Sequence, residues 1–125
     1  MTIQFKQTLA PTKDNSGKPI ILSDATFAQR KDKVLQLMRK YDFSSLMIYA
    51  DKEHGSNFEY LTGFIPRFEE ALQVINQDGT STLILGNENY NRTSMARRQG
   101  EGVLCPYFSL PNQPMHFTKT FADYL

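Results

Sequence analysis

The residues whose types suit catalysis or metal binding are few, and the densest group is Asp51-Lys52-Glu53-His54. Carboxylates and imidazoles are metal ligands, but side chains this close in sequence converge on one ion only when a special loop directs them. No second histidine or cysteine lies at ligand spacing, so we expect no metal site here. The other histidine, His116, is expected to be a surface or packing residue.

Nucleophilic catalysis would need a second kind of site, a nucleophile with a neighbouring base. Cys105 is the only cysteine, and no histidine lies near it in sequence. It sits in an apolar run, so we expect a buried, unreactive thiol. Arg92, Arg97 and Arg98 have no glycine-rich phosphate loop beside them and are expected to lie on a solvated face. The sequence therefore offers no nucleophile–base pair and no phosphate site.

The composition is that of a soluble globular protein. Of 125 residues, 40% are hydrophobic and 22% charged, and 14 basic against 13 acidic residues give a net charge of +1. Such a chain has no overall field that favours nucleic acid or an anionic membrane. A single cysteine excludes an internal disulfide framework and suits a reducing compartment. With no signal-like segment and no membrane-spanning run, we expect a cytoplasmic protein without nucleic-acid or membrane partners.

The elements that would position a site are organised around residues 57–89. Two apolar runs, 71–75 and 82–85, flank an Asp-Gly pair, which predicts a β-hairpin with a type I′ turn. Ahead of the hairpin, residues 58–62 predict a short helix that ends at Gly63. Asn57 is expected to cap this helix at its start.

The first half of the chain predicts a helix and a strand of a layered α/β domain. Residues 25–41 carry an apolar stripe at the 3.6-residue period, and Ser23 or Asp24 can cap this helix. The apolar run 46–50 shows no alternation, which is typical of a strand buried on both faces. We therefore expect it to be a central strand. The polar loop at 51–57 follows that strand, at a place where α/β sheets often bind ligands.

The rest of the chain completes this domain. Residues 1–19 predict an N-terminal arm and connector, ahead of a single domain over residues 20–125. Glu88 and Asn89 are expected to cap a following helix. The remaining predicted elements are a polar helix at 90–99 with core contacts from Met95 and Ala96, a strand at 103–107 that stops at Pro106 or lies at an edge, and a short helix at 117–125.

These motifs resemble the N-terminal domain of creatinase, prolidase and Xaa-Pro aminopeptidase proteins. The resemblance covers about residues 20–108. It is carried by Arg30, the run 46–51, Asn57, Tyr60-Leu61-Thr62-Gly63-Phe64, Glu69-Glu70 and the hairpin through Gly86-Asn87-Glu88. It implies a three-layer α/β/α domain with a mixed sheet of ribonuclease H-like type, in agreement with the element order read from the residues.

The resemblance implies a non-catalytic role within a metal-dependent Xaa-Pro peptidase, a hydrolase. In that family a C-terminal domain holds two divalent ions (Mn, Co or Zn) on two aspartates, a histidine and two glutamates, and the ions activate water. The sequence ends at Leu125, where that domain would begin, so we expect the catalytic domain and its metals to be missing from this chain. The implied partners are that catalytic domain, a second copy in a homodimer and, indirectly, a peptide substrate.

Candidate residues for substrate access or an interface flank the matched motif. We expect them to be exposed, and they are His54, Asn57, Tyr60, Phe64, Arg67 and Glu69. The 64–68 loop is the first choice, because an arginine beside aromatic residues is a common interface anchor. The simpler alternative packs Phe64 and Phe68 on the sheet and pairs Arg67 with Glu69 or Glu70.

Two other functions remain open from the sequence. The first is a stand-alone small-molecule or peptide binding module of the same fold, using the 51–57 loop together with Phe64 and Arg67. The second is an enzyme in its own right, which would need a site that the sequence does not reveal.

Overall fold

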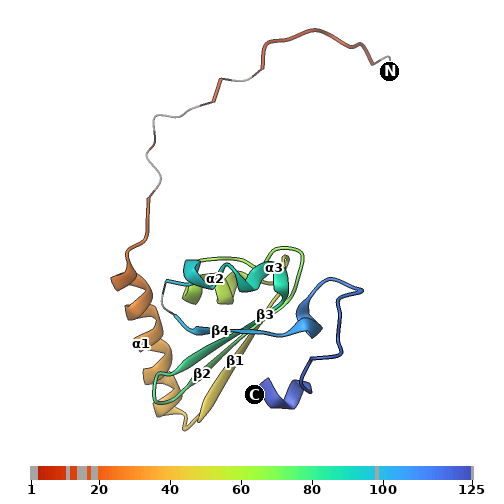
Figure 1. The fold of residues 1–125 in the computed structure, drawn as a ribbon. Coiled ribbons are helices and arrows are strands. Elements are labelled where there is room, and N and C mark those ends of the chain that lie inside the picture. The colour runs from red at the N-terminus through yellow and green to blue at the C-terminus, as the bar shows by residue number, and fades with distance from the viewer. Residues whose placement is uncertain (1–2, 11, 14–16, 18–19, 98, 125) are drawn as a thin grey trace.

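The chain folds around a mixed four-stranded sheet with the strand order β1-β2-β3-β4 (Figure 1). In this computed structural model, β1 (Ser45–Ala50) pairs antiparallel with β2 (Ala71–Asn76), and β2 pairs antiparallel with β3 (Ser81–Leu85). The last strand, β4 (Glu101–Leu104), runs parallel to β3. The structure describes residues 3–10, 12–13, 17, 20–97 and 99–124. The predicted α/β class with a mixed sheet is confirmed.

The helical elements come mostly from short segments. They are α1 (Asp24–Lys40), α2 (Ser56–Thr62), α3 (Asn87–Tyr90) and the 3₁₀ helices η1 (Thr93–Met95), η2 (Pro106–Phe108) and η3 (Phe121–Tyr124). The predicted cap of α1 is confirmed, because the Ser23 hydroxyl accepts a hydrogen bond from the Thr26 backbone N–H at 3.2 Å. None of the helices among the described residues is long and apolar enough to cross a bilayer.

The two faces of the sheet are covered differently. On one face, buried side chains of the strands pack against α1 and α2, for example Ile75 against Met38 and Leu61. On the other face, the apolar side chains of β2 and β3 meet Cys105, Phe108 and Tyr124 from the C-terminal segment. The second layer therefore consists of 3₁₀ helices and irregular chain, which pass beside the sheet in Figure 1.

The strand β1 lies at an edge of the sheet, so the prediction of a central strand is wrong. Its side chains alternate between the two faces: Ala50 is buried, whereas Met47 is 55% and Tyr49 48% exposed. The sequence hides this alternation because the outward residues are themselves large and apolar or amphipathic. The C-terminal layer stops short of these two residues, which leaves this part of the sheet face open.

The hairpin between β2 and β3 is confirmed, but its predicted type I′ turn is wrong. A type I′ turn needs positive φ at both central residues. Here Gly79 has φ 92°, and Asp78 is not among the positive-φ residues of the described chain. The turn closes through a hydrogen bond from Gly79 N–H to Asn76 O at 2.9 Å. The Asp78 carboxylate accepts a hydrogen bond from the Thr80 backbone N–H at 2.8 Å. This bond stabilises a connection that is longer than the two-residue loop of a type I′ hairpin.

The polar helix predicted at 90–99 is broken, because α3 ends at Tyr90 and η1 covers only three residues. Ala96 is fully buried as expected, whereas Met95 is 47% exposed. Arg97 has φ 51°, which a right-handed helix cannot accommodate. The predicted final helix is likewise reduced to the four-residue η3, where Thr120 N–H bonds the Asp123 carboxylate at 2.8 Å.

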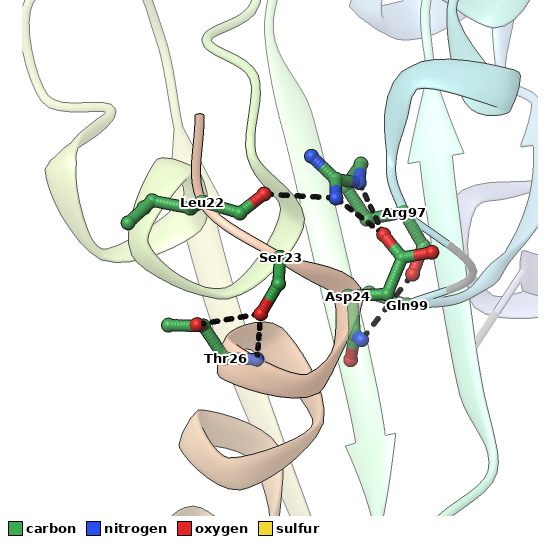
Figure 2. Close-up of polar contacts among 6 residues, drawn as sticks. All are labelled: Leu22, Ser23, Asp24, Thr26, Arg97 and Gln99. Atoms are coloured by element: carbon green, nitrogen blue, oxygen red, sulfur yellow. Dashed lines mark hydrogen bonds and ion pairs between the residues drawn. The ribbon is translucent and has the colours of Figure 1, made fainter. Parts of the chain in front are cut away.

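Arg97 ties the start of α1 to the segment before β4, as Figure 2 shows. Its Nε donates to the Asp24 carboxylate at 2.6 Å, its guanidinium also forms an ion pair with that carboxylate, and Nη2 donates to Leu22 O at 2.9 Å. The same guanidinium lies 5.1 Å from the centre of the buried Phe27 ring. The expectation that Arg97 lies on a solvated face is therefore wrong. The sequence does not reveal these contacts, because Asp24 lies 73 positions away.

Gly63 ends α2 in the left-handed conformation, as predicted, with φ 86° and its N–H bonded to Glu59 O at 2.8 Å. A Cβ at this position would lie 3.1 Å from both Arg97 Cγ and Phe27 Cζ. Position 63 therefore needs glycine for two reasons, its positive φ and the close approach of two side chains.

We predict that Gly63→Ala lowers the free energy of unfolding by about 1–3 kcal/mol, because alanine strains the left-handed backbone and crowds Phe27. Chemical denaturation followed by circular dichroism measures the loss. Gly17→Ala is the matched control, since no atom lies within 4 Å of a Cβ built there. Equal stability of the two variants would contradict this account of position 63.

Candidate functional site

A buried polar network joins the loop before β2 to the start of α3. Glu69 is 5% exposed and Asn89 is fully buried. The Glu69 Oε2 atom accepts hydrogen bonds from the backbone N–H of Glu88 at 2.9 Å and of Asn89 at 3.2 Å, and from Asn89 Nδ2 at 3.2 Å. Glu69 thus satisfies the N–H groups that open α3, in the manner of a capping residue.

The predicted capping roles of Glu88 and Asn89 are wrong, because both lie inside α3 and the N-cap position is Gly86. Glycine there makes room for the distant carboxylate: a Cβ at residue 86 would lie 2.5 Å from Glu69 Oε2. The expected exposure of Glu69 is also wrong. A capping residue 19 positions earlier in the chain leaves no local signal that sequence reasoning can detect.

Asn89 also holds the loop around Arg67. Its Oδ1 accepts the Arg67 backbone N–H at 2.9 Å, and its Nδ2 donates to Arg67 O at 3.3 Å. Next to this clamp, Phe68 takes φ 62° and its side chain is 65% exposed. The Arg67 guanidinium lies 5.8 Å from the Phe68 ring centre. The salt bridges found among the described residues are His54–Asp51 and Arg97–Asp24, so none of them involves Arg67.

Phe64 is a core residue. It is 4% exposed, and its ring meets the Phe58 ring edge-on at 5.3 Å between centroids. The expectation of an exposed Phe64 is therefore wrong, because the left-handed Gly63 turns the chain back onto the sheet. Of the 64–68 loop, Ile65, Arg67 and Phe68 remain at the surface.

Tyr60 lies on α2 and contacts α1. Its backbone carbonyl accepts Arg30 Nη1 at 2.7 Å, and the Arg30 guanidinium lies 4.2 Å from the centre of its ring. The ring is 48% exposed and borders a cavity of about 320 Å³ that Arg30 and Glu59 also line. Arg30, one of the residues that carry the resemblance, therefore connects the two helices through Tyr60.

Asn57 does not cap α2, because the helix starts one residue earlier, at Ser56, with Gly55 as its N-cap. Its exposed side chain lines another cavity, of about 460 Å³, together with Tyr49 and Tyr60. This cavity therefore lies between α2 and the edge strand β1.

His54 and Asp51 form an exposed ion pair in the loop after β1. His54 Nδ1 lies 3.0 Å from both carboxylate oxygens, and Asp51 Oδ1 also accepts the backbone N–H of Glu53 at 2.7 Å and of His54 at 2.6 Å. The hydrogen bond to Asp51 raises the pKa of His54, and the same bond lowers the pKa of Asp51. Within the part of the chain that the structure describes, no three His, Cys, Asp or Glu side chains are placed to hold a metal ion.

The candidate site is a cavity of about 480 Å³ where three segments meet. They are residues 51–53 after β1, 68–70 before β2 and 107–111 after η2. The Glu70 backbone N–H donates to Phe108 O at 3.3 Å and joins two of these walls. Sequence reasoning found the 51–57 loop and Glu69, but it missed the 107–111 wall, which only the path of the C-terminal segment brings here.

Cys105 stands apart from this site. It is fully buried as predicted, and burial raises the pKa of its thiol. A protonated thiol in the core is a poor nucleophile.

Comparisons with known proteins support the fold. The chain matches no protein-family model and no curated protein. Among solved structures, it is similar to the N-terminal, creatinase/prolidase-like domain of a candidate metallopeptidase from Corynebacterium diphtheriae, with a TM-score of 0.54 and 16% sequence identity. The match covers 63% of this chain and 59% of that one. The predicted creatinase/prolidase N-terminal-like fold is thereby confirmed.

We predict that the pKa of His54 lies above its ordinary value of 6.5 and falls toward that value in Asp51→Asn. NMR titration of the imidazole measures both values, with Glu101→Gln as the control that removes a distant negative charge. The pair stabilises the fold fully between the unfolded pKa values of 3.8 and 6.5. That contribution is lost as pH rises through the folded pKa of His54 or falls through that of Asp51. An unchanged His54 pKa in Asp51→Asn would contradict the pair.

We predict that Asn89→Ala costs about 1–3 kcal/mol of stability, because it leaves the Arg67 N–H without its buried acceptor. Asn87→Ala is the matched control, since its exposed side chain bonds only Gln113 in the described structure, and it should change stability by less than about 0.5 kcal/mol. Denaturant unfolding of both variants gives the comparison. A cost for Asn89→Ala as small as that of the control would show that the network does not stabilise the loop.

Proposed function

We propose that this chain is a non-catalytic N-terminal domain of a metal-dependent Xaa-Pro aminopeptidase or dipeptidase. In this role it supports oligomerisation and shapes the access of peptide substrates to a catalytic domain. The observation that carries the proposal is the fold similarity to the N-terminal domain of a candidate metallopeptidase. The motif at residues 57–64, which carries the sequence resemblance, forms α2 and its glycine cap in the structure.

The open part of the sheet face supports a role in packing against another domain or a second copy. Met47 and Tyr49 on β1 and Tyr60 on α2 are each about half exposed, and all three line the same cavity. Apolar surface of this kind on a small domain is typical of a contact between domains. Arg67 and Phe68 offer a second exposed patch, of the arginine-and-aromatic type that anchors interfaces.

The metal chemistry of such a peptidase belongs, in this proposal, to the catalytic domain. A two-metal centre needs clustered carboxylate and histidine ligands, which bind Mn, Co or Zn and activate water. The described residues bring no such cluster together, so their side chains do not fit the metal pair. A cytoplasmic location, which suits the single buried Cys105, completes the proposal.

A stand-alone binding module is the second candidate function. It is favoured by the cavity of about 480 Å³ between the 51–53, 68–70 and 107–111 segments, whose size suits a small molecule or a peptide side chain. This function requires no catalytic domain.

We expect Xaa-Pro hydrolysis from the full-length protein supplied with Mn, Co or Zn, and none from the 125-residue chain alone under the same conditions. A coupled assay of proline release from an Xaa-Pro dipeptide, with a tripeptide assay beside it, makes the comparison. Metal analysis should find about two ions per chain in the full-length protein only. Hydrolysis by the isolated chain, or a full-length protein inactive with each metal, would contradict the proposal.

A further inference from the structure

The cavity between the 51–53, 68–70 and 107–111 segments combines negative charge with aromatic side chains. Its walls are Asp51, Lys52, Glu53, Phe68, Glu69, Glu70, Tyr107, Phe108, Ser109, Leu110 and Pro111. Four of these residues are acidic and one is basic. This composition favours a positively charged guest.

The carboxylates are not equally available. Asp51 is already engaged by His54 and by two backbone N–H groups, whereas Glu53 and Glu70 are exposed. Burial raises the pKa of Tyr49, and the negative charges of Glu70 and Asp51 and a side-chain hydrogen bond to Glu70 raise it further, so the two carboxylates act on the same phenol. Two cations oppose this field: Lys52 lines the cavity, and Arg67 lies beside the Phe68 ring.

The burial and hydrogen bonding of Glu69 give a second indication of a ligand, separate from the charge of the cavity. Glu69 is 5% exposed and lines the cavity, yet only one of its two carboxylate oxygens is used. Oε2 accepts three hydrogen bonds, whereas the buried Oε1 has no hydrogen-bond partner among the described residues. No ion pair among the described residues neutralises this carboxylate. Because a buried charge is costly without a partner, a cation in the cavity would lower the cost of burying Glu69.

Two aromatic rings complete the walls. Phe68 is 65% and Tyr107 54% exposed, so part of each ring is accessible to a ligand in the cavity. Faces of such rings attract Arg and Lys side chains. The network of Asn89 and Glu69 contacts the residues on either side of Phe68, so it places the Phe68 backbone beside the cavity before any ligand arrives.

We propose that this cavity binds the guanidinium or ammonium group of a peptide. A metal ion is a poorer guest, since the described acidic side chains do not form a group of three at ligand distance. Arginine is the better fit of the two cations, because a planar guanidinium stacks on aromatic rings and bonds a carboxylate with two parallel N–H groups. The volume of about 480 Å³ accommodates one side chain with its flanking backbone. This site requires no catalytic domain, so it stands or falls separately from the proposed peptidase.

The test is a titration of the 125-residue chain with acetyl-Gly-Arg-Gly-amide, followed by backbone-amide NMR shifts around residues 51–53 and 68–70. The citrulline peptide, a neutral mimic of arginine, should bind at least about 10-fold more weakly. A lysine peptide and a triglycine amide with a free N-terminus distinguish a side-chain cation from a terminal ammonium. Saturable binding of any of the three cationic peptides, with loss in the neutral one, supports the site. Equal binding of citrulline, or no saturable binding of any cationic peptide at millimolar concentration, overturns it.

Variants then locate the binding. Glu70→Gln and Phe68→Ala should each weaken the arginine peptide by about 5-fold or more, and both residues are exposed, so the fold should survive. Glu101→Gln and Phe5→Ala are the matched controls, because both residues are exposed and outside the cavity. A circular-dichroism melt of each variant checks folding. Wild-type affinity in both cavity variants would overturn the assignment.

Discussion

The architecture of the candidate site depends on one buried carboxylate. Glu69 bonds the N–H groups at the start of α3, and Asn89, in the same network, clamps the backbone of Arg67. These contacts hold the second half of the connection from α2 to β2, where Phe68 is exposed, whereas the left-handed Gly63 directs Phe64 into the core. The contact also explains Gly86, since a side chain there would collide with Glu69. Without the Glu69 carboxylate, α3, the 64–68 loop and the 68–70 segment of the cavity would lose the hydrogen bonds that connect them.

One face of the sheet is covered by helices, and the other face is only partly covered. Helices α1 and α2 cover the first, and their contact is strengthened by Arg30, which bonds and stacks on Tyr60. The C-terminal 3₁₀ helices cover the second only over β2 and β3, so that Met47 and Tyr49 on the edge strand stay exposed. The surface available for a partner therefore follows from the strand order, which puts β1 at the edge, and from the path of the C-terminal segment.

Some features that depend on neighbours in sequence were predictable, although the turn type and the caps of α2 and α3 were not. The Ser23 cap, the left-handed Gly63 and the hairpin each follow from one or a few adjacent residues. Features that depend on distant partners were not. Glu69 caps a helix 19 residues later, and Arg97 bonds Asp24 across 73 residues. The edge position of β1 was missed for a related reason, since burial of a strand depends on which elements lie beside it, not on its own composition.

The same division applies to the site. The acidic 51–57 loop and the exposed Arg67 and Phe68 could be picked out from residue types, whereas the third wall at 107–111 could not. The central claim, that this is the accessory domain of a two-metal peptidase, is tested most directly by sequencing the reading frame beyond the codon for Leu125. The account predicts a following domain with well-separated Asp, Asp, His, Glu and Glu residues. A stop codon there, or a following domain without those residues, would contradict it.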